Sequence, residues 1–191
     1  MHTGMGRTKA LRNLLIGPAM LALAVMSGGC HTAAWWRTLT NDLPVMGHRN
    51  WIVVADSAYP AQSRAGIETI CTGGNQIEVV AAVLKALDHT RHVRPVVYLD
   101  SELQYVSDQD ARGISVYRDQ LKRILGNRPV TSIPHEELIA KLDKAGETFR
   151  ILILKTNMTL PYTSVFLQAD CGYWSAEAEQ RLREAIKAAA K

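Results

Sequence analysis

A glycine-histidine turn followed by a short apolar strand and an aspartate constrains this chain more than any other segment. Gly47 and His48 precede Ile52–Ala55, a continuous apolar and largely β-branched run typical of a buried strand, and Asp56 follows it directly. A strand rises about 3.3 Å per residue, so His48 and Asp56 flank one rigid element roughly 15 Å apart along the chain. A loop that folds back would shorten that distance. We expect the two residues to serve a small polar ligand held at the edge of a sheet.

Strands and helices are predicted to alternate along the rest of the chain, which favours a layered α/β domain. Asn75 and Ser175 are candidate N-caps, the second for a helix that runs to about Ala190. The polar segment 100–112 is expected to be a loop. The other expected strands are 67–72, 93–99, 149–154 and 165–167, and the other expected helices are 35–45, 77–87, 114–125 and one that opens at Pro134.

The N-terminal segment has the three-part layout of a secretory signal. It begins with a positive, polar stretch, continues with the 13 apolar residues Leu14–Met26, and ends with small residues before Cys30. Such a run is short for a spanning helix, and a cysteine at this boundary resembles a bacterial lipobox. We expect residues 1–29 to be a signal peptide, Cys30 to be lipidated, and residues 30–191 to form one exported domain. An uncleaved anchor and an ordinary cleaved signal are alternatives, and both also place the domain outside the cytoplasm.

Charge and cysteine usage narrow the possible functions. The net charge is +4, but the leader carries three positive side chains and no acid, so the remaining chain is close to neutral. Nucleic-acid binding therefore has no electrostatic support. His89 and His92 have a spacing that could bind a metal, but no third ligand is evident, and no metal site is expected. Cys71 and Cys171 could form a disulfide in an exported protein or remain buried free thiols.

Three motifs together resemble the D-ribose pyranase and L-fucose mutarotase family, also called RbsD/FucU. The first is Met46-Gly47-His48 followed by the segment from Ile52 through Asp56 to Pro60. The second is Ile133-Pro134-His135-Glu136-Glu137-Leu138, and the third combines Lys155-Thr156 with Pro161-Tyr162-Thr163-Ser164. All three occur in the family's order, and they span residues 36 to about 170.

The resemblance implies an isomerase that opens and recloses the ring of a free ribose- or fucose-like monosaccharide, without a metal or an organic cofactor. His48 matches the family's proton donor, a role suited to a side chain that titrates near neutrality. Asp56 matches the carboxylate that binds sugar hydroxyls, and Tyr162 matches the closing tyrosine. The other substrate-binding candidates are His135, Ser164, which stands where the family has asparagine, and Lys155, with Lys144 as its alternative.

The same resemblance implies a three-layer α/β fold with a mixed central sheet. It also implies a homo-oligomeric ring, in which the closing tyrosine segment helps to form a neighbour's site. Two other functions remain open: a non-catalytic monosaccharide-binding lipoprotein, which would need Asp56 but not His48 as an acid, and a structural lipoprotein with an empty pocket. The predicted terminal helix extends past the usual end of the family. The family is usually cytoplasmic, whereas this chain is expected to be exported and lipid-anchored to a membrane of the bacterial cell envelope.

Overall fold

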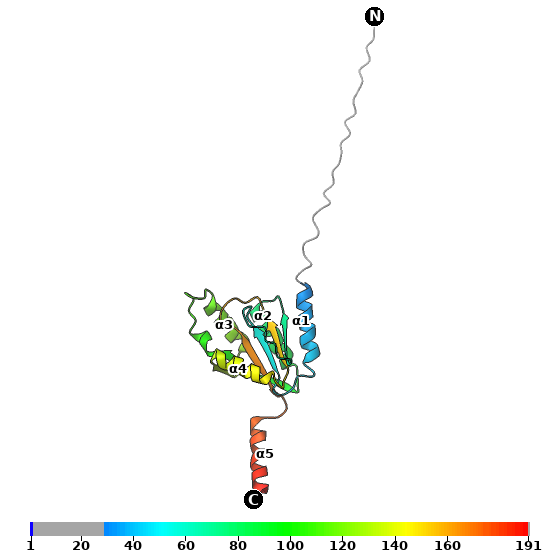
Figure 1. Ribbon diagram of the computed structural model, residues 1–191, viewed down its shortest axis with the longest axis vertical. Coiled ribbons are helices and arrows are strands. Elements are labelled where there is room, and N and C mark those ends of the chain that lie inside the picture. The colour runs from blue at the N-terminus through cyan, green and yellow to red at the C-terminus, as the bar shows by residue number, and fades with distance from the viewer. Residues whose placement is uncertain (2–28, 191) are drawn as a thin grey trace.

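The computed structural model of the 191-residue chain describes residue 1 and residues 29–190 (Figure 1). Six strands form one sheet in the order β2-β5-β1-β6-β3-β4. The strands are β1 (Trp51–Ala55), β2 (Ile67–Cys71), β3 (Val93–Asp100), β4 (Val130–Ile133), β5 (Ile151–Lys155) and β6 (Val165–Cys171). The helices of the described residues are α1 (Gly29–Asp42), α2 (Gln76–Asp88), the 3-10 helix η1 (Ser101–Gln104), α3 (Ile114–Leu125), α4 (His135–Ala145) and α5 (Ala176–Ala189).

Strand direction is mixed, because one central strand runs against the others. β1 pairs in parallel with β5, and β5 pairs in parallel with β2. β6 lies antiparallel to both β1 and β3, and β3 runs parallel to β4. The carboxyl ends of β1 to β5 therefore share one edge of the sheet with the amino end of β6. We call this the carboxyl edge, and the opposite one the amino edge.

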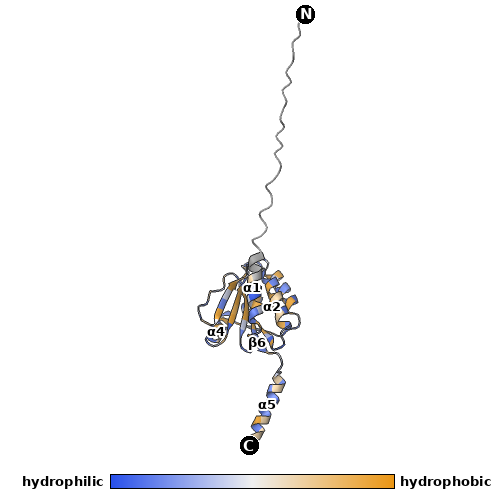
Figure 2. Ribbon diagram, turned by 90° about the vertical axis from the view of Figure 1, so that its right-hand side faces the viewer, coloured by the Kyte–Doolittle hydropathy of each residue, from blue (hydrophilic) through white to orange (hydrophobic). Residues whose placement is uncertain are grey.

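Apolar side chains cover both faces of the sheet, which makes the molecule three layers thick. All five residues of β1 are buried; Ile52 and Val54 pack into one core cluster, and Trp51, Val53 and Ala55 into the other. Helices α1, α2 and α3 supply the first cluster, and α4 supplies the second. Figure 2 shows α1 and α2 on one side of the strands and α4 on the other. The expected α/β class and mixed sheet are confirmed.

Capping side chains begin two of the helices as the sequence predicts. The Asn75 carboxamide oxygen accepts hydrogen bonds from two backbone N–H groups at the start of α2, and the Ser175 hydroxyl accepts one at the start of α5. No residue of α5 is buried, and this helix extends away from the sheet (Figure 1). Helix α1 spans Gly29–Asp42, so it begins and ends earlier than the helix expected over residues 35–45, a correction to the sequence analysis.

The described residues bear on some of the predictions for the N-terminus and the cysteines. The proposed signal peptide and the side chain of Cys30 lie outside the described residues. In the described part of the chain, no helix has the length and hydrophobicity needed to span a membrane. Cys71 and Cys171 are both free thiols. They end β2 and the antiparallel β6, so they lie at opposite edges of the sheet with two strands between them.

One buried amide ties together three segments at the carboxyl edge. The Nε2 group of Gln76, the first residue of α2, donates to the carbonyl oxygens of Val54 at 3.0 Å and Thr163 at 2.8 Å. Its Oε1 accepts a hydrogen bond from the hydroxyl of Thr156, which follows β5. Gln76 is fully buried, so removal of its amide would take one hydrogen bond from each of these groups where water has no access. The Thr163 carbonyl would keep its bond from the Tyr117 hydroxyl, and the Thr156 hydroxyl would keep the Ala55 carbonyl.

Replacement of Gln76 by methionine should therefore lower the free energy of unfolding by about 2–4 kcal/mol, because three buried hydrogen bonds are lost together. Urea denaturation measures the change. The matched control is Gln180→Met on α5, where the exposed side chain bonds to Glu184. This variant should change the free energy of unfolding by no more than about 0.5 kcal/mol. Equal changes in the free energy of unfolding for the two variants would show that the hydrogen bonds of Gln76 do not stabilise this edge.

Candidate active site

The carboxyl edge gathers ionisable and hydroxyl side chains from segments far apart in the sequence. Asp56 follows β1, Asp100 ends β3, and His135 opens α4 directly after β4 and Pro134. Ser164 immediately precedes β6. Carboxyl ends of neighbouring strands are where open α/β sheets place their ligands, so this edge is the candidate site.

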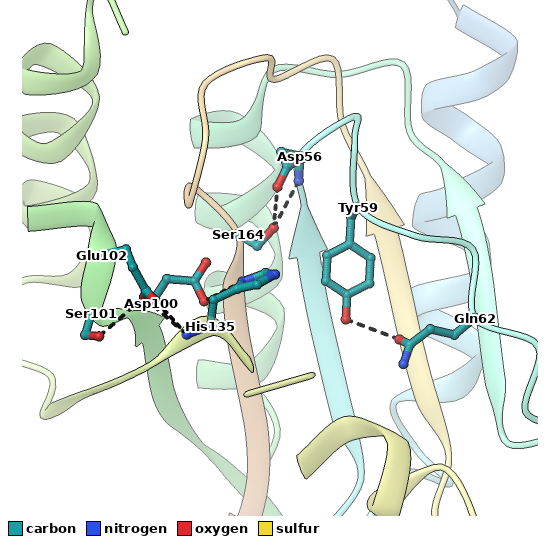
Figure 3. Close-up of polar contacts among 8 residues, drawn as sticks. All are labelled: Asp56, Tyr59, Gln62, Asp100, Ser101, Glu102, His135 and Ser164. Atoms are coloured by element: carbon teal, nitrogen blue, oxygen red, sulfur yellow. Dashed lines mark hydrogen bonds and ion pairs between the residues drawn. The ribbon is translucent and has the colours of Figure 1, made fainter. Parts of the chain in front are cut away.

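Asp56 and Ser164 form a directly bonded pair (Figure 3). The Ser164 hydroxyl donates to Asp56 Oδ2 at 2.9 Å, and the backbone N–H of Asp56 donates back to the hydroxyl oxygen at 3.2 Å. The N–H of Ala58 donates to Asp56 Oδ1 at 2.9 Å, which fixes the carboxylate over the turn that follows β1. Ser164 is buried and Asp56 is partly exposed, so the carboxylate keeps acceptor capacity on the solvent side.

His135 is positioned by two carboxylates. Its backbone N–H, at the start of α4, donates to both carboxylate oxygens of Glu102 at 3.1 Å. Its ring Nδ1 lies 3.1 Å from Asp100 Oδ1, and the His135 side chain is 29% exposed while that of Asp100 is fully buried. With Nδ1–H donating to Asp100, the free Nε2 of His135 is a proton acceptor or donor. Figure 3 shows His135 between the Asp100 and Asp56 side chains.

Burial sets the charge behaviour of Asp100. Desolvation raises the pKa of this carboxyl to about 6, although the hydrogen bond and positive charge of His135 act against the rise. Asp100 Oδ2 is buried and has no hydrogen-bond partner among the described residues. A buried carboxyl with a raised pKa therefore lies directly against the His135 ring, an arrangement typical of functional sites.

Tyr162 and Lys155 lie close to this group in different roles. The ring of Tyr162 packs edge-on against His135, with 5.7 Å between ring centroids, and Tyr162 is 38% exposed. Its backbone has a φ of 56°, which turns the chain sharply before β6. The Lys155 ammonium donates to the backbone carbonyl of Tyr59 at 2.7 Å, so Lys155 supports the loop after Asp56. Lys144, the alternative to Lys155, lies on α4 and faces a separate hollow beside Trp51 and Tyr98.

His48 lies at the opposite edge of the sheet. It precedes β1, whereas Asp56 follows it, and five strand residues separate their backbones by roughly 16 Å. His48 Nδ1 contacts Asp170 Oδ1, near the end of β6, at 3.0 Å. The expectation that His48 and Asp56 act at one ligand is therefore not met within a single chain, because the fully buried strand β1 holds them at opposite edges of the sheet.

Sequence reasoning missed the two carboxylates that position His135. Asp100 directly follows the apolar run of β3, as Asp56 follows that of β1, and this shared position was the available signal. Glu102 lies in η1, within the segment expected to be a loop. No group of three or more His, Cys, Asp or Glu side chains in the described residues could hold a metal ion. A wide groove lies elsewhere, between α1 and α2, and the residues that line it include no carboxylate for a sugar hydroxyl.

Comparison with known proteins gives one match at the level of a family. The sequence model of the RbsD / FucU transport protein family matches residues 36–172. No curated protein gives a significant match. Among solved structures, Bacillus subtilis RbsD complexed with D-ribose has 21% identity and a TM-score of 0.49, covering 69% of this chain and 90% of its own. Fucose mutarotase from Streptococcus pneumoniae in complex with L-fucose has 22% identity and a TM-score of 0.46, with 69% and 89% coverage.

FucU from Bifidobacterium longum has 20% identity and a TM-score of 0.46, with 69% and 92% coverage. The family assignment rests on the sequence match to residues 36–172, which includes every residue of the carboxyl edge described above.

The raised pKa of Asp100 predicts a specific pH dependence of stability. An unfolded aspartate has a pKa near 3.9, and the folded value of about 6 means that the folded chain binds the proton more tightly. Wild type should therefore lose stability relative to Asp100→Asn as pH rises from about 4 to 6, by up to about 3 kcal/mol, with no further change above. Urea denaturation across this range measures the difference. Asp119→Asn, which replaces an exposed aspartate, is the control. A difference in unfolding free energy between wild type and Asp100→Asn that does not change with pH would contradict the raised pKa of Asp100.

Proposed function

Because the chain belongs to the RbsD/FucU transport protein family, we propose that it interconverts the anomers of a free monosaccharide by opening and reclosing the sugar ring. One observation carries the proposal: the Asp56–Ser164 and Asp100–His135 pairs converge at the carboxyl edge, inside the segment that matches the family. A carboxylate for sugar hydroxyls thus lies beside an imidazole that can exchange protons.

Asp56 is the main sugar ligand in this proposal. Its carboxylate has about four acceptor positions, and the Ala58 N–H and the Ser164 hydroxyl use two of them. The remaining positions can accept sugar hydroxyls, and a hydrogen bond to a charged group contributes about 1.5–3 kcal/mol. Ser164 holds the carboxylate in place, a role that suits its short, buried side chain. The exposed ring of Tyr162 offers an apolar surface beside the same position.

Ring opening requires two proton transfers. One proton leaves the anomeric hydroxyl as its oxygen becomes the carbonyl oxygen, and one reaches the ring oxygen as its bond to the anomeric carbon breaks. His135 Nε2 can accept the first proton, since its Nδ1 faces Asp100. We assign delivery of the second to His48, the counterpart of the family's proton donor. Ring closure on the other face reverses both transfers and regenerates both groups.

His48 can reach the sugar only from a second copy of the chain. Strand β1 holds it at the amino edge of its own chain, and its side chain is 56% exposed. We therefore propose a homo-oligomer in which the amino edge of one chain meets the carboxyl edge of the next. A head-to-tail contact of this kind closes into a ring when the rotation between copies permits.

A non-catalytic monosaccharide-binding protein is the second candidate. It is favoured by one observation: the Asp56–Ser164 pair is complete in a single chain, whereas the proposed proton donor is not part of that chain's site. For either function, we retain the proposal that residues 1–29 direct export and that Cys30 anchors the protein to a membrane of the bacterial cell envelope. The basis is the three-part layout of the leader.

Two variants separate binding from catalysis. Asp56→Asn should weaken monosaccharide binding by about 10- to 100-fold, because it removes the charge that strengthens the hydrogen bonds. His48→Ala should leave binding in place and remove the acceleration of anomer exchange. Saturation-transfer NMR on a panel that includes D-ribose and L-fucose measures both properties. His89→Ala, which replaces a histidine at the end of α2, is the matched control and should behave as wild type.

The outcomes distinguish the two candidates. Binding without accelerated exchange in wild type would identify the chain as a binding protein. A His48→Ala variant that accelerates exchange as well as wild type would remove His48 from the mechanism. Failure of the whole panel to bind would contradict both candidates.

A further inference from the structure

Three side chains from separate segments meet at the amino edge of the sheet. His48 lies on the turn before β1, Asp170 lies near the end of β6, and Arg94 is the second residue of β3. Asp170 Oδ1 lies 3.0 Å from His48 Nδ1. Asp170 Oδ2 accepts hydrogen bonds from Arg94 Nε at 3.1 Å and from Nη2 at 2.7 Å. Each carboxylate oxygen therefore has its own partner.

The turn that carries His48 is also held rigidly. The Asn50 carboxamide oxygen accepts a hydrogen bond from the Gly47 N–H at 2.7 Å, and the Asn50 N–H donates to the Gly47 carbonyl at 3.1 Å. The Arg49 N–H donates to the Ala169 carbonyl of β6 at 2.8 Å, which binds the turn to the strand that carries Asp170. His48 and Asp170 are thus fixed relative to one another through the backbone as well as through their side chains.

We propose that Asp170, held by Arg94, is a positioning residue that fixes the proton of His48 on Nδ1 and leaves Nε2 as the atom that transfers a proton to the sugar. This inference rests on the proposed function, because His48 must be the donor for its protonation state to matter. Asp170 and Arg94 lie outside the carboxyl edge, and neither belongs to the three motifs or to the proposed binding site at Asp56.

The chemistry requires a partner of this kind. Protonated His48 carries a proton on both ring nitrogens; Nδ1–H donates to the Asp170 carboxylate, and Nε2–H faces the solvent side. When Nε2 gives its proton to the ring oxygen of the sugar, the neutral imidazole that remains keeps its proton on Nδ1. The negative charge of Asp170 stabilises the positive ring before transfer and the correct tautomer after it.

The Arg94 contact keeps Asp170 available for this role. Burial acts to raise the pKa of Asp170, but the hydrogen bonds from Arg94 and from the Cys171 backbone, the charge of Arg94 and a smaller contribution from His48 hold it below its ordinary value. Glu177 on α5 also faces this cluster, because its charge interacts with that of Arg94. Arg49 follows His48 in sequence, but its guanidinium lies over the Phe149 ring. The three side chains are 28–56% exposed, and ion pairs at such positions contribute little stability. The arrangement is therefore better explained by control of His48 than by stabilisation of the fold.

Replacement of Asp170 by asparagine tests the proposal through the tautomer of His48. Arg94 is a hydrogen-bond donor only, so it retains the carboxamide oxygen of Asn and turns the NH₂ group toward His48. Nδ1 must then accept a hydrogen bond, which moves the ring proton to Nε2. Long-range ¹H–¹⁵N NMR on the full chain, at about pH 8 where imidazole is neutral, reports the tautomer directly. We expect the Nδ1–H form in wild type and the Nε2–H form in Asp170→Asn.

Two controls accompany this measurement. His89 Nδ1 lies 2.7 Å from the Lys85 carbonyl, so its tautomer should be the same in both proteins. Arg94→Met added to Asp170→Asn frees the amide to turn its oxygen toward His48, and the Nδ1–H form should return in part. The rate of anomer exchange at saturating sugar should fall by about 100-fold or more in Asp170→Asn, with sugar affinity unchanged.

The possible results separate this inference from the function on which it rests. An unchanged His48 tautomer in Asp170→Asn, or an Nε2–H form already present in wild type, would overturn the inference even if wild type accelerates anomer exchange. A tautomer that switches without a loss of exchange rate would overturn it as well. Absence of exchange in wild type would overturn the proposed function, and with it any catalytic role for Asp170. A tautomer switch together with the slower exchange would support both.

Discussion

Strand β1 fixes the distance between Asp56 and His48, and the proposed chemistry depends on that separation. The strand pairs with β5 on one side and β6 on the other, and all five of its residues are buried between two layers of helices. Neither end can move without breaking a ladder of hydrogen bonds and exposing core side chains. A sugar bound at Asp56 is therefore beyond the reach of His48 in the same chain. Assembly becomes part of the proposed mechanism.

The antiparallel strand β6 completes both halves of the proposed site. At its amino end Ser164 holds the Asp56 carboxylate, and near its carboxyl end Asp170 holds His48. A parallel strand in the same place would put Ser164 at the amino edge and Asp170 at the carboxyl edge, away from Asp56 and His48. The side chain of Gln76 supports the first of these ends. It donates hydrogen bonds to the carbonyl oxygen of Val54, two residues before Asp56, and to that of Thr163, directly before Ser164.

Much of the fold could be predicted from the sequence, because its signals are local. The buried strand β1 and the helix caps at Asn75 and Ser175 follow from apolar runs and polar residues at fixed offsets. The sequence does not predict strand β4, because Val130–Ile133 is short, mostly exposed and without an apolar pattern. It lies at the edge of the sheet, where it pairs with β3. The candidate site was partly predictable: Asp56, His135, Tyr162 and Ser164 come together at one edge. The separation of His48 from them depends on strand direction, and the Asp100–His135 pair depends on strand order. Neither property is encoded in a local pattern.

Subunit mixing tests the shared site most directly. His48→Ala chains, which lack the proton donor, and Asp56→Asn chains, which bind the sugar weakly, would be produced together so that they assemble at random. The assay would use a sugar concentration too low for Asp56→Asn to act alone. If His48 of one chain serves the Asp56 of another, roughly a quarter of the sites in an equal mixture contain both intact residues, and anomer exchange should recover to about that fraction of the wild-type rate. A mixed assembly as inactive as either variant, with both chains shown to be present by mass, would contradict a site shared between copies.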